Sequence, residues 1–190
     1  MISKNRCFGN KPNQRLYADY HDNEWGIPKY NDRELFELLI LEGAQAGLNW
    51  ETILKKRQGY RDAFYNFDPA KIADMTDSEL ETLRSNPNII RNKLKIYATR
   101  KNAQAFLQIQ KKFGSFSDYL WAFVDNKPIK NHWESHKEVP TSTSISEKIS
   151  KDLKKRGMSF VGPTIIYAYM QAAGLVNDHL VNCWCYTINK

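Results

Sequence analysis

The sequence predicts an all-α fold, a helical bundle formed by a single domain over residues 1–190. Capping residues stand before apolar runs of helical spacing along most of the chain. A sustained alternation of apolar and polar residues, which marks a half-buried strand, is absent. At 190 residues, the chain is also long enough to bury a core of its own.

Helix caps define the expected elements of the first half. Asn31 or Asp32 is expected to cap an apolar helix that begins near residue 34. Three more helices of the first half are expected to begin after a polar cap. The caps are Asn49 for a helix through Lys56 and Arg57, Asp68 before Pro69, and the capping box Thr76 to Glu79 before Leu80 and Leu83.

The second half continues in the same way. Residues 91–112 are expected to form a long basic amphipathic helix whose apolar side carries Leu94, Ala98, Ala105 and Ile109. Three later helices are expected from hydroxyl caps, proline and glycine. Ser115 caps a helix over 116–124, and a capping box at 144–147 opens a helix that runs to Gly157. Pro163 starts the last helix and Gly174 ends it. Residues 125–143 form one long polar connection, expected to be a mobile surface loop.

Composition narrows the class of partner. The net charge of +7 and the pI near 9.2 favour a polyanionic partner. Residues 1–10 lack the apolar core of a signal peptide, and no run approaches the roughly 20 apolar residues of a membrane span. We therefore expect a cytoplasmic protein without a membrane partner, whose three cysteines are free thiols or metal ligands. We also expect the protein to be a monomer.

Glu42 is the most unusual residue of the apolar helix. It follows Leu35, Leu38 and Leu39 at helical spacing, so it points to the same buried side. A buried carboxylate is costly unless it is paired, hydrogen-bonded or functional. Gly43 and Gly47 leave room beside it, and the indole of Trp50 follows. This combination predicts a pocket for a flat, electron-poor or cationic ligand.

Residues 146–174 read as two helices joined by a tight turn between two glycines, a helix-hairpin-helix. Such a motif holds a DNA backbone through free N–H groups at the start of its second helix and through nearby cations. The residues expected to contact DNA are Lys154, Arg156, Gly157, Gly162 and Thr164. The alternative is an ordinary turn between helices with a solvated basic rim.

Cys7, His21, His179 and Cys183 are the candidate metal ligands. A helix would place His179 and Cys183 on one face, and two thiolates with two imidazoles complete a tetrahedral zinc site without an open position. One structural zinc ion would then tie the N-terminal segment to the C-terminal one. Cys185 is the competing ligand, and free thiols with hydrogen-bonded histidines are the alternative. His132 and His136 are expected to be exposed.

Tyr17 and Tyr20 stand three residues apart and can share one face. Two phenols near an indole and an acid can hold a heterocycle by stacking and hydrogen bonding. An aromatic lid over the core is the alternative for these two residues.

Five segments together resemble the DNA-3-methyladenine glycosylase I family: residues 20–26, 41–57, 140–144, 153–163 and 173–179. The resemblance covers nearly the whole chain, from Cys7 to about Tyr186. It implies base-excision repair by a monofunctional glycosylase with bound zinc. Such an enzyme flips 3-methyladenine out of double-stranded alkylated DNA, hydrolyses its N-glycosidic bond, releases the free base and leaves an abasic site.

The resemblance also assigns roles to residues. It implies zinc ligands at Cys7, His21, His179 and Cys183. It implies a base pocket formed by Glu42, Tyr20 and Trp50, with Tyr17 nearby. We expect Glu42, the catalytic residue, to hydrogen-bond the flipped base and to favour its methylated form.

Two other functions are compatible with parts of the sequence. A non-catalytic helix-hairpin-helix DNA-binding module with structural zinc would explain the hairpin and the ligands, but it needs no buried acid at position 42. A zinc hydrolase would need an open coordination position, which four Cys and His ligands do not leave. Asp178 is expected to cap a helix or to support His179.

Overall fold

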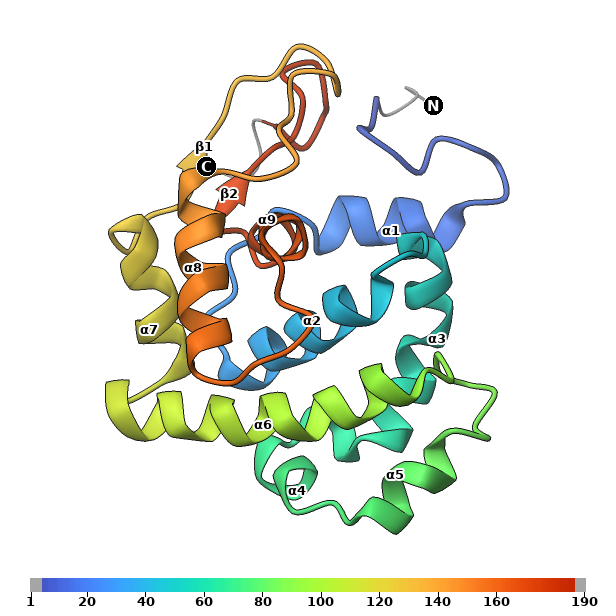
Figure 1. The fold of residues 1–190 in the computed structure, drawn as a ribbon. Helices are drawn as coiled ribbons and strands as arrows, with labels where there is room; N and C mark the ends of the chain where they lie inside the picture. The colour runs from blue at the N-terminus through green and yellow to red at the C-terminus, as the bar shows by residue number, and fades with distance from the viewer. Residues whose placement is uncertain (1–4, 187–190) are drawn as a thin grey trace.

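The computed structural model describes residues 5–186, and its regular secondary structure is almost entirely helical (Figure 1). Helix α2 lies in the middle, with α8 and α9 on one side and the long α6 on the other (Figure 1). The helices in chain order are α1 (Arg15–Asn23), α2 (Asp32–Gln45), α3 (Trp50–Ala63), α4 (Pro69–Ala73), α5 (Asp77–Leu83), α6 (Lys93–Phe113), α7 (Phe116–Trp121), α8 (Ser144–Lys155) and α9 (Pro163–Ala172). The predicted all-α class is therefore confirmed. No described helix is long and apolar enough to cross a membrane.

Helix α2 forms the centre of the core because it has almost no polar side. Every residue from 35 to 44 is buried, in contact with α3, α6, α7 and α9. Each large aliphatic side chain enclosed in this way contributes about 1.5–3 kcal/mol to folding. The predicted burial of this helix, and of Glu42 within it, is confirmed.

Asn31 and Asp32, the two alternative caps of α2, cap different helices. The Asn31 side chain accepts hydrogen bonds from the N–H groups of Arg33 and Glu34, at 3.0 and 3.2 Å. The carboxylate of Asp32 instead accepts from the N–H groups of Phe116 and Ser117, both at 2.8 Å. It also accepts from the Gln110 amide at 2.6 Å, so Asp32 joins the start of α2 to α6 and α7.

Most of the predicted boundaries are confirmed. The caps at Asn49, Asp68, Thr76 and Ser115 all form, Pro163 opens α9, and Gly174 follows α9 with a φ of +73°. A side chain at Gly174 would also lie only 2.4 Å from the backbone of Ile27 and Pro28, which explains the glycine.

Three details of the prediction were wrong. The capping box of α8 is formed by Thr143 with Ser146, one residue earlier than expected, and α8 ends at Lys155 rather than at Gly157. Several hydroxyl residues stand in a row there, so the sequence alone does not single out the cap. Leu94 is 71% exposed rather than on the apolar side, because it lies in the first turn of α6, where no helix covers it.

The connection at 125–143 is anchored to the rest of the protein. Within it, β1 (Ile129–Lys130) pairs in parallel with β2 (Val176–Asn177), which follows α9. Two-residue strands are too short to show alternation in the sequence. The indole of Trp133 and the amide of Asn131 also donate to Asp178. This segment therefore forms part of the wall around the candidate site.

The position of Asp32 leads to a stability prediction. We expect Asp32→Ala to lower the free energy of unfolding by about 2–3 kcal/mol, because three hydrogen bonds to one carboxylate are lost and two helix-start N–H groups lose their acceptor. Urea denaturation measures this change. Asp62→Ala, at an exposed position of α3, is the matched control with a change below about 0.5 kcal/mol. Equal effects of the two substitutions would contradict the account.

Candidate functional site

A cavity of about 240 Å³ lies beside the C-terminal half of α2. It is bounded by α1, α2, α3, α9 and the 125–143 segment. The lining residues are mostly aromatic with a few polar groups: Phe8, Tyr17, Tyr20, Trp25, Glu42, Gln45, Trp50, His136, Val139, Ala168, Gln171 and Asp178. The four residues predicted to form a pocket, Tyr17, Tyr20, Glu42 and Trp50, therefore lie around one cavity.

Glu42 is buried at the cavity without a polar partner. Its side chain is 4% exposed, and its Oε2 atom is enclosed with no hydrogen-bond partner among the described residues. Burial raises the pKa of Glu42 to about 8 from the ordinary 4.5, because no nearby cation compensates the lost hydration. Burial thus favours the protonated acid at neutral pH, and a cationic ligand would favour the carboxylate.

Trp50 supplies an unpaired hydrogen-bond donor at the cavity, whereas Glu42 supplies an unpaired acceptor. Its indole Nε1–H is enclosed and donates to no described acceptor. The ring lies 5.5 Å from the ring of Tyr20, at an interplanar angle of 52°. Burial, followed by the nearby Glu42, raises the pKa of Tyr20, so its phenol stays neutral. An enclosed acceptor and an enclosed donor between aromatic rings are what a flat heterocycle with polar edges requires.

The remaining aromatic rings form one packed group. Phe8 stacks on Tyr17 with ring centroids 4.5 Å apart and contacts Trp25 edge-on at 5.0 Å. Rings held in this way offer a rigid apolar surface.

Cys7, His21, His179 and Cys183 meet behind this cavity, all buried, with ligand atoms within 4.8 Å of one another. Cys183 Sγ lies 3.4 Å from His21 Nε2 and 3.6 Å from His179 Nδ1, and Cys7 Sγ lies 3.7 Å from His179 Nδ1. Metal–ligand bonds of about 2.0–2.3 Å would span such separations. The predicted four residues thus form a cluster that could hold a metal ion.

The outer nitrogens of both imidazoles are already oriented. His21 Nδ1 lies 3.0 Å from the carboxylate of Asp22, and His179 Nε2 lies 3.2 Å from the carbonyl oxygen of Trp25. Arg6 holds Asp22 through two hydrogen bonds of 2.7 and 2.8 Å. Partners of this type fix the tautomer of metal-binding histidines, so the surroundings fit a metal site as well as the four ligands do.

Three members of the cluster are chain neighbours of cavity residues. Phe8 follows Cys7, Tyr20 precedes His21, and Asp178 precedes His179. The position of the cluster therefore fixes the position of the cavity wall. Cys185, the competing ligand, lies outside the four, with its Sγ 3.9 Å from His21 Nδ1.

His132 and His136 are exposed as predicted. His136 nevertheless lines the cavity, and its Nε2 lies 2.8 Å from the Cys7 carbonyl oxygen. This contact joins the 125–143 segment to the start of the chain.

The residues predicted to contact DNA lie in the turn between α8 and α9 and in the adjoining ends of these helices. Lys154 and Thr164 are exposed, Gly157 has a φ of +96°, and Gly162 precedes α9, which has no side-chain cap. Arg156 is less free than expected. Its guanidinium lies 2.5 Å from Asp152 and about 5 Å from the rings of Phe113 and Tyr119.

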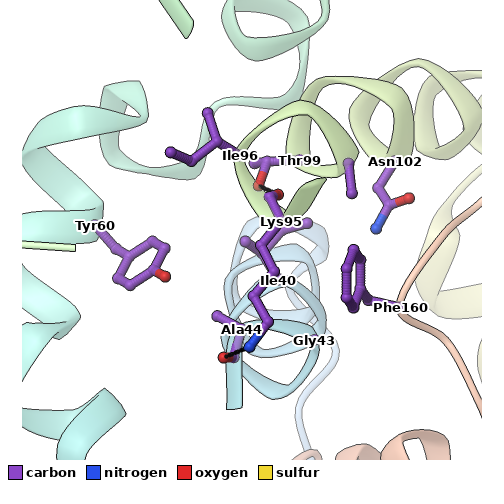
Figure 2. A pocket seen from close by; sticks show the side chains of 10 residues that line it. Ile40, Gly43, Ala44, Tyr60, Lys95, Ile96, Thr99, Asn102 and Phe160 are labelled. Carbon is purple, nitrogen blue, oxygen red and sulfur yellow. Dashed lines mark hydrogen bonds between the residues drawn. The ribbon is translucent and has the colours of Figure 1, made fainter. Parts of the chain in front are cut away.

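This turn is fixed to the helix that carries Glu42. Figure 2 shows Phe160 of the turn beside Gly43 of α2, where an added Cβ would lie 3.2 Å from Phe160. Asn102 of α6 bonds the backbone N–H and carbonyl of Ser159, at 2.8 and 2.9 Å. The expectation that Gly43 leaves room for a ligand was therefore wrong, because Phe160 fills that space and leaves only about 10 Å³.

Sequence reasoning missed part of the cavity. Gln171 is a polar residue within the apolar helix α9, the same signal that identified Glu42 in α2. Asp178 was expected to cap a helix or support His179; no described helix begins after it, and its carboxylate accepts four side-chain hydrogen bonds. His136 and Val139 carried no local signal, because a connecting segment brings them to the cavity.

The buried acid predicts an unusual dependence of stability on pH. The unfolded chain ionises Glu42 near pH 4.5, whereas the folded protein keeps the proton to about pH 8, so stability is lost as the pH rises between these values. We expect Glu42→Gln to be more stable than wild type, on the order of 4 kcal/mol above pH 8, with little difference below pH 4.5.

Denaturant unfolding across this pH range checks the expectation. Glu34→Gln, an exposed position in the first turn of α2, is the matched control and should show no such trend. A pH-independent difference between wild type and Glu42→Gln would show that Glu42 ionises normally in the folded protein.

Comparison with known proteins identifies the family. Residues 10–186 match the family model described as methyladenine glycosylase. The chain is 51% identical over 175 residues to DNA-3-methyladenine glycosylase 1 of Escherichia coli (strain K12), covering 92% of this chain and 94% of the relative. A crystal structure of 3-methyladenine DNA glycosylase I matches with a TM-score of 0.92 at 49% identity, covering 95% and 99% of the two chains. A variant of 3-methyladenine DNA glycosylase I in complex with 3-methyladenine matches with a TM-score of 0.91 at 39% identity, covering 95% and 96%. The chain therefore belongs to the methyladenine glycosylase family.

Proposed function

We propose that this protein is a monofunctional DNA-3-methyladenine glycosylase of base-excision repair. It hydrolyses the N-glycosidic bond of 3-methyladenine in alkylated double-stranded DNA and leaves an abasic site. The observation that carries the proposal is the cavity beside Glu42, in which an unpaired buried acid and an unpaired indole N–H lie among aromatic rings. Relatives named for this activity support the same conclusion.

The chemistry of the lesion explains why so few catalytic groups are needed. Methylation at N3 puts a positive charge on the adenine and weakens its bond to the sugar. Water adds to C1′, the C1′–N9 electron pair goes to the base, and the water loses a proton to solvent. The cationic base leaves as neutral 3-methyladenine. Extrusion and selection of the base are therefore the main tasks of the protein.

Glu42 supplies the selection in this proposal. An unpaired carboxylate buried in the protein is energetically costly, but a cationic base supplies the missing counter-charge and donates hydrogen bonds to the carboxylate. A normal adenine is neutral and gives less compensation. Tyr20 and Trp50 border or stack on the base, with Tyr17 at the cavity edge.

The segment at 146–174 is proposed as the helix-hairpin-helix that holds the DNA backbone. Support comes from the exposed Lys154 and Thr164 and from the start of α9, where Gly162 provides no side-chain cap. Gly157 allows the turn, and Arg156 adds charge to the same end. Because Phe160 packs on Gly43, a phosphate held at the turn lies in fixed relation to Glu42.

The Cys7–His21–His179–Cys183 cluster is proposed as a structural site for one zinc ion. Support comes from the two thiols, the two imidazoles and the oriented outer nitrogens. When bound, zinc would supply structural cross-linking. We further propose that residues 1–190 act as one monomeric domain in the cytoplasm.

Two alternatives are less well supported. A non-catalytic DNA-binding module has no use for the two unpaired polar atoms enclosed at the cavity. A zinc hydrolase needs a coordination position for water, which the four side chains of the cluster would leave closed.

Release of free base from methylated DNA tests the proposed function. We expect kcat/KM for 3-methyladenine release to rise with pH up to about 8 and then level off, because the ionised Glu42 of the free enzyme binds the cationic base. Glu42→Gln should lose this pH dependence and fall on the order of 10- to 100-fold at pH above 8.

Glu34→Gln should follow the wild-type profile and is the control for a charge change in the same helix. No release by folded wild-type protein would contradict the function. Release by Glu42→Gln with the wild-type rate and profile would contradict only the role of Glu42.

Metal analysis tests the zinc site. After dialysis, wild type should hold one zinc ion per chain, and Cys183→Ser should hold much less, because three ligands remain and the serine is a poor substitute. Cys185→Ser is the matched control and should keep its zinc, since Cys185 lies outside the cluster. Stoichiometric zinc in Cys183→Ser would exclude this ligand set.

A further inference from the structure

Asp178 and Gln171 form a polar part of the cavity wall to which the proposed mechanism gives no task. Asp178 is 2% exposed, yet all its hydrogen-bonding capacity is used. Oδ1 accepts from the amide of Asn131 at 2.7 Å and from the indole of Trp133 at 2.9 Å. Oδ2 accepts from the hydroxyl of Tyr167 at 2.7 Å and from the amide of Gln171 at 2.8 Å.

A carboxylate has about four lone-pair positions, and four donors fill those of Asp178. It therefore has none left to accept a proton from an attacking water or to contact a base directly. Its effect on the cavity must pass through the side chains that it holds.

Gln171 is the one of these four donors that lines the cavity. The carboxylate of Asp178 can only accept, so the amide NH2 of Gln171 must face it, and the amide Oε1 points elsewhere. Oε1 is not among the enclosed, unpaired atoms, and no described group donates to it. The side-chain amide oxygen Oε1 of Gln171 is thus an accessible hydrogen-bond acceptor on a cavity residue, and Asp178 sets its orientation.

We propose that Gln171 is a specificity-determining residue. Its side-chain amide oxygen Oε1 accepts a hydrogen bond from the exocyclic amino group of the flipped base, and Asp178 is its positioning residue. This inference rests on the proposed glycosylase function. Adenine carries an amino donor at C6, whereas guanine carries a carbonyl acceptor there. A fixed acceptor therefore favours 3-methyladenine over 3-methylguanine, because the guanine oxygen would face the amide oxygen with no hydrogen between them.

The network predicts what happens when Asp178 becomes asparagine. The indole of Trp133 can only donate, so the single oxygen of the new amide must face Trp133, and its NH2 group must face Tyr167 and Gln171. Gln171 would then turn its amide so that its oxygen accepts from this NH2. Its own NH2 would replace the oxygen at the cavity, and the acceptor would become a donor.

The experiment measures initial rates of 3-methyladenine and 3-methylguanine release from methylated duplex DNA. The quantity compared among variants is the 3-methyladenine rate divided by the 3-methylguanine rate. Gln171→Met removes the acceptor at similar size, and we expect the ratio to fall about three- to tenfold. Asp178→Asn should lower the ratio further by favouring the guanine carbonyl. The double variant should match Gln171→Met alone, because Asp178 acts through Gln171. Gln108→Met, at an exposed position of α6, is the matched control and should leave both rates unchanged.

An unchanged ratio in Gln171→Met would overturn the inference, even if both rates fall together, because that is what a purely structural role would give. If Asp178→Asn changed the rate ratio equally in wild type and in the Gln171→Met background, the positioning role of Asp178 would be overturned. Zinc content and the unfolding midpoint of each variant show whether the fold is intact, and Gln171→Met tests the inference even if Asp178→Asn fails to fold. Failure of wild type to release either base would instead contradict the proposed function itself.

Discussion

The burial of the Glu42 carboxyl group without a partner is the constraint around which the site is arranged. Residues 35–44 of helix α2 are all buried, so a polar side chain among them needs a partner, either from the protein or from a ligand. For Glu42 Oε2, none of the described residues supplies such a partner. The aromatic rings around the cavity provide an apolar surface but no compensating charge. In the proposed function, a flat cationic group supplies the missing partner of Glu42, and this gives a methylated base an advantage over a normal one.

The walls of this cavity depend on segments that lie far apart in the chain. The Cys and His cluster joins the N-terminal segment to the C-terminal segment, and its members are chain neighbours of Phe8, Tyr20 and Asp178. Asp178 in turn holds the 125–143 segment through Asn131 and Trp133. On the other side, Gly43 and Asn102 fix the turn after α8 against the core. The cavity and the proposed DNA-binding turn are thus attached to the same central helix.

Local chemistry explains which parts of the structure were predictable. Helix caps act over three residues, so Asn49, Thr76 and Ser115 could be found from the sequence. Glu42 was found because it interrupts an apolar helix. The hydrogen bonds of Asp32 span 84 residues or more to α7, and those of Asp178 reach back 47 residues to Asn131, so no local pattern reveals them. For Leu94, helical spacing predicted burial but the residue is exposed, because spacing alone does not tell whether another helix covers a residue.

The proposed recognition of a cationic base depends most directly on the protonation of Glu42 in the folded protein. Carbon-13 NMR of labelled glutamate carboxyl groups, with the Glu42 signal assigned by its loss in a Glu42→Gln sample, measures its titration in the folded protein. We expect a midpoint near pH 8 in the free protein and a shift of that midpoint when 3-methyladenine binds. A midpoint near the ordinary 4.5, unchanged by the base, would contradict this expectation.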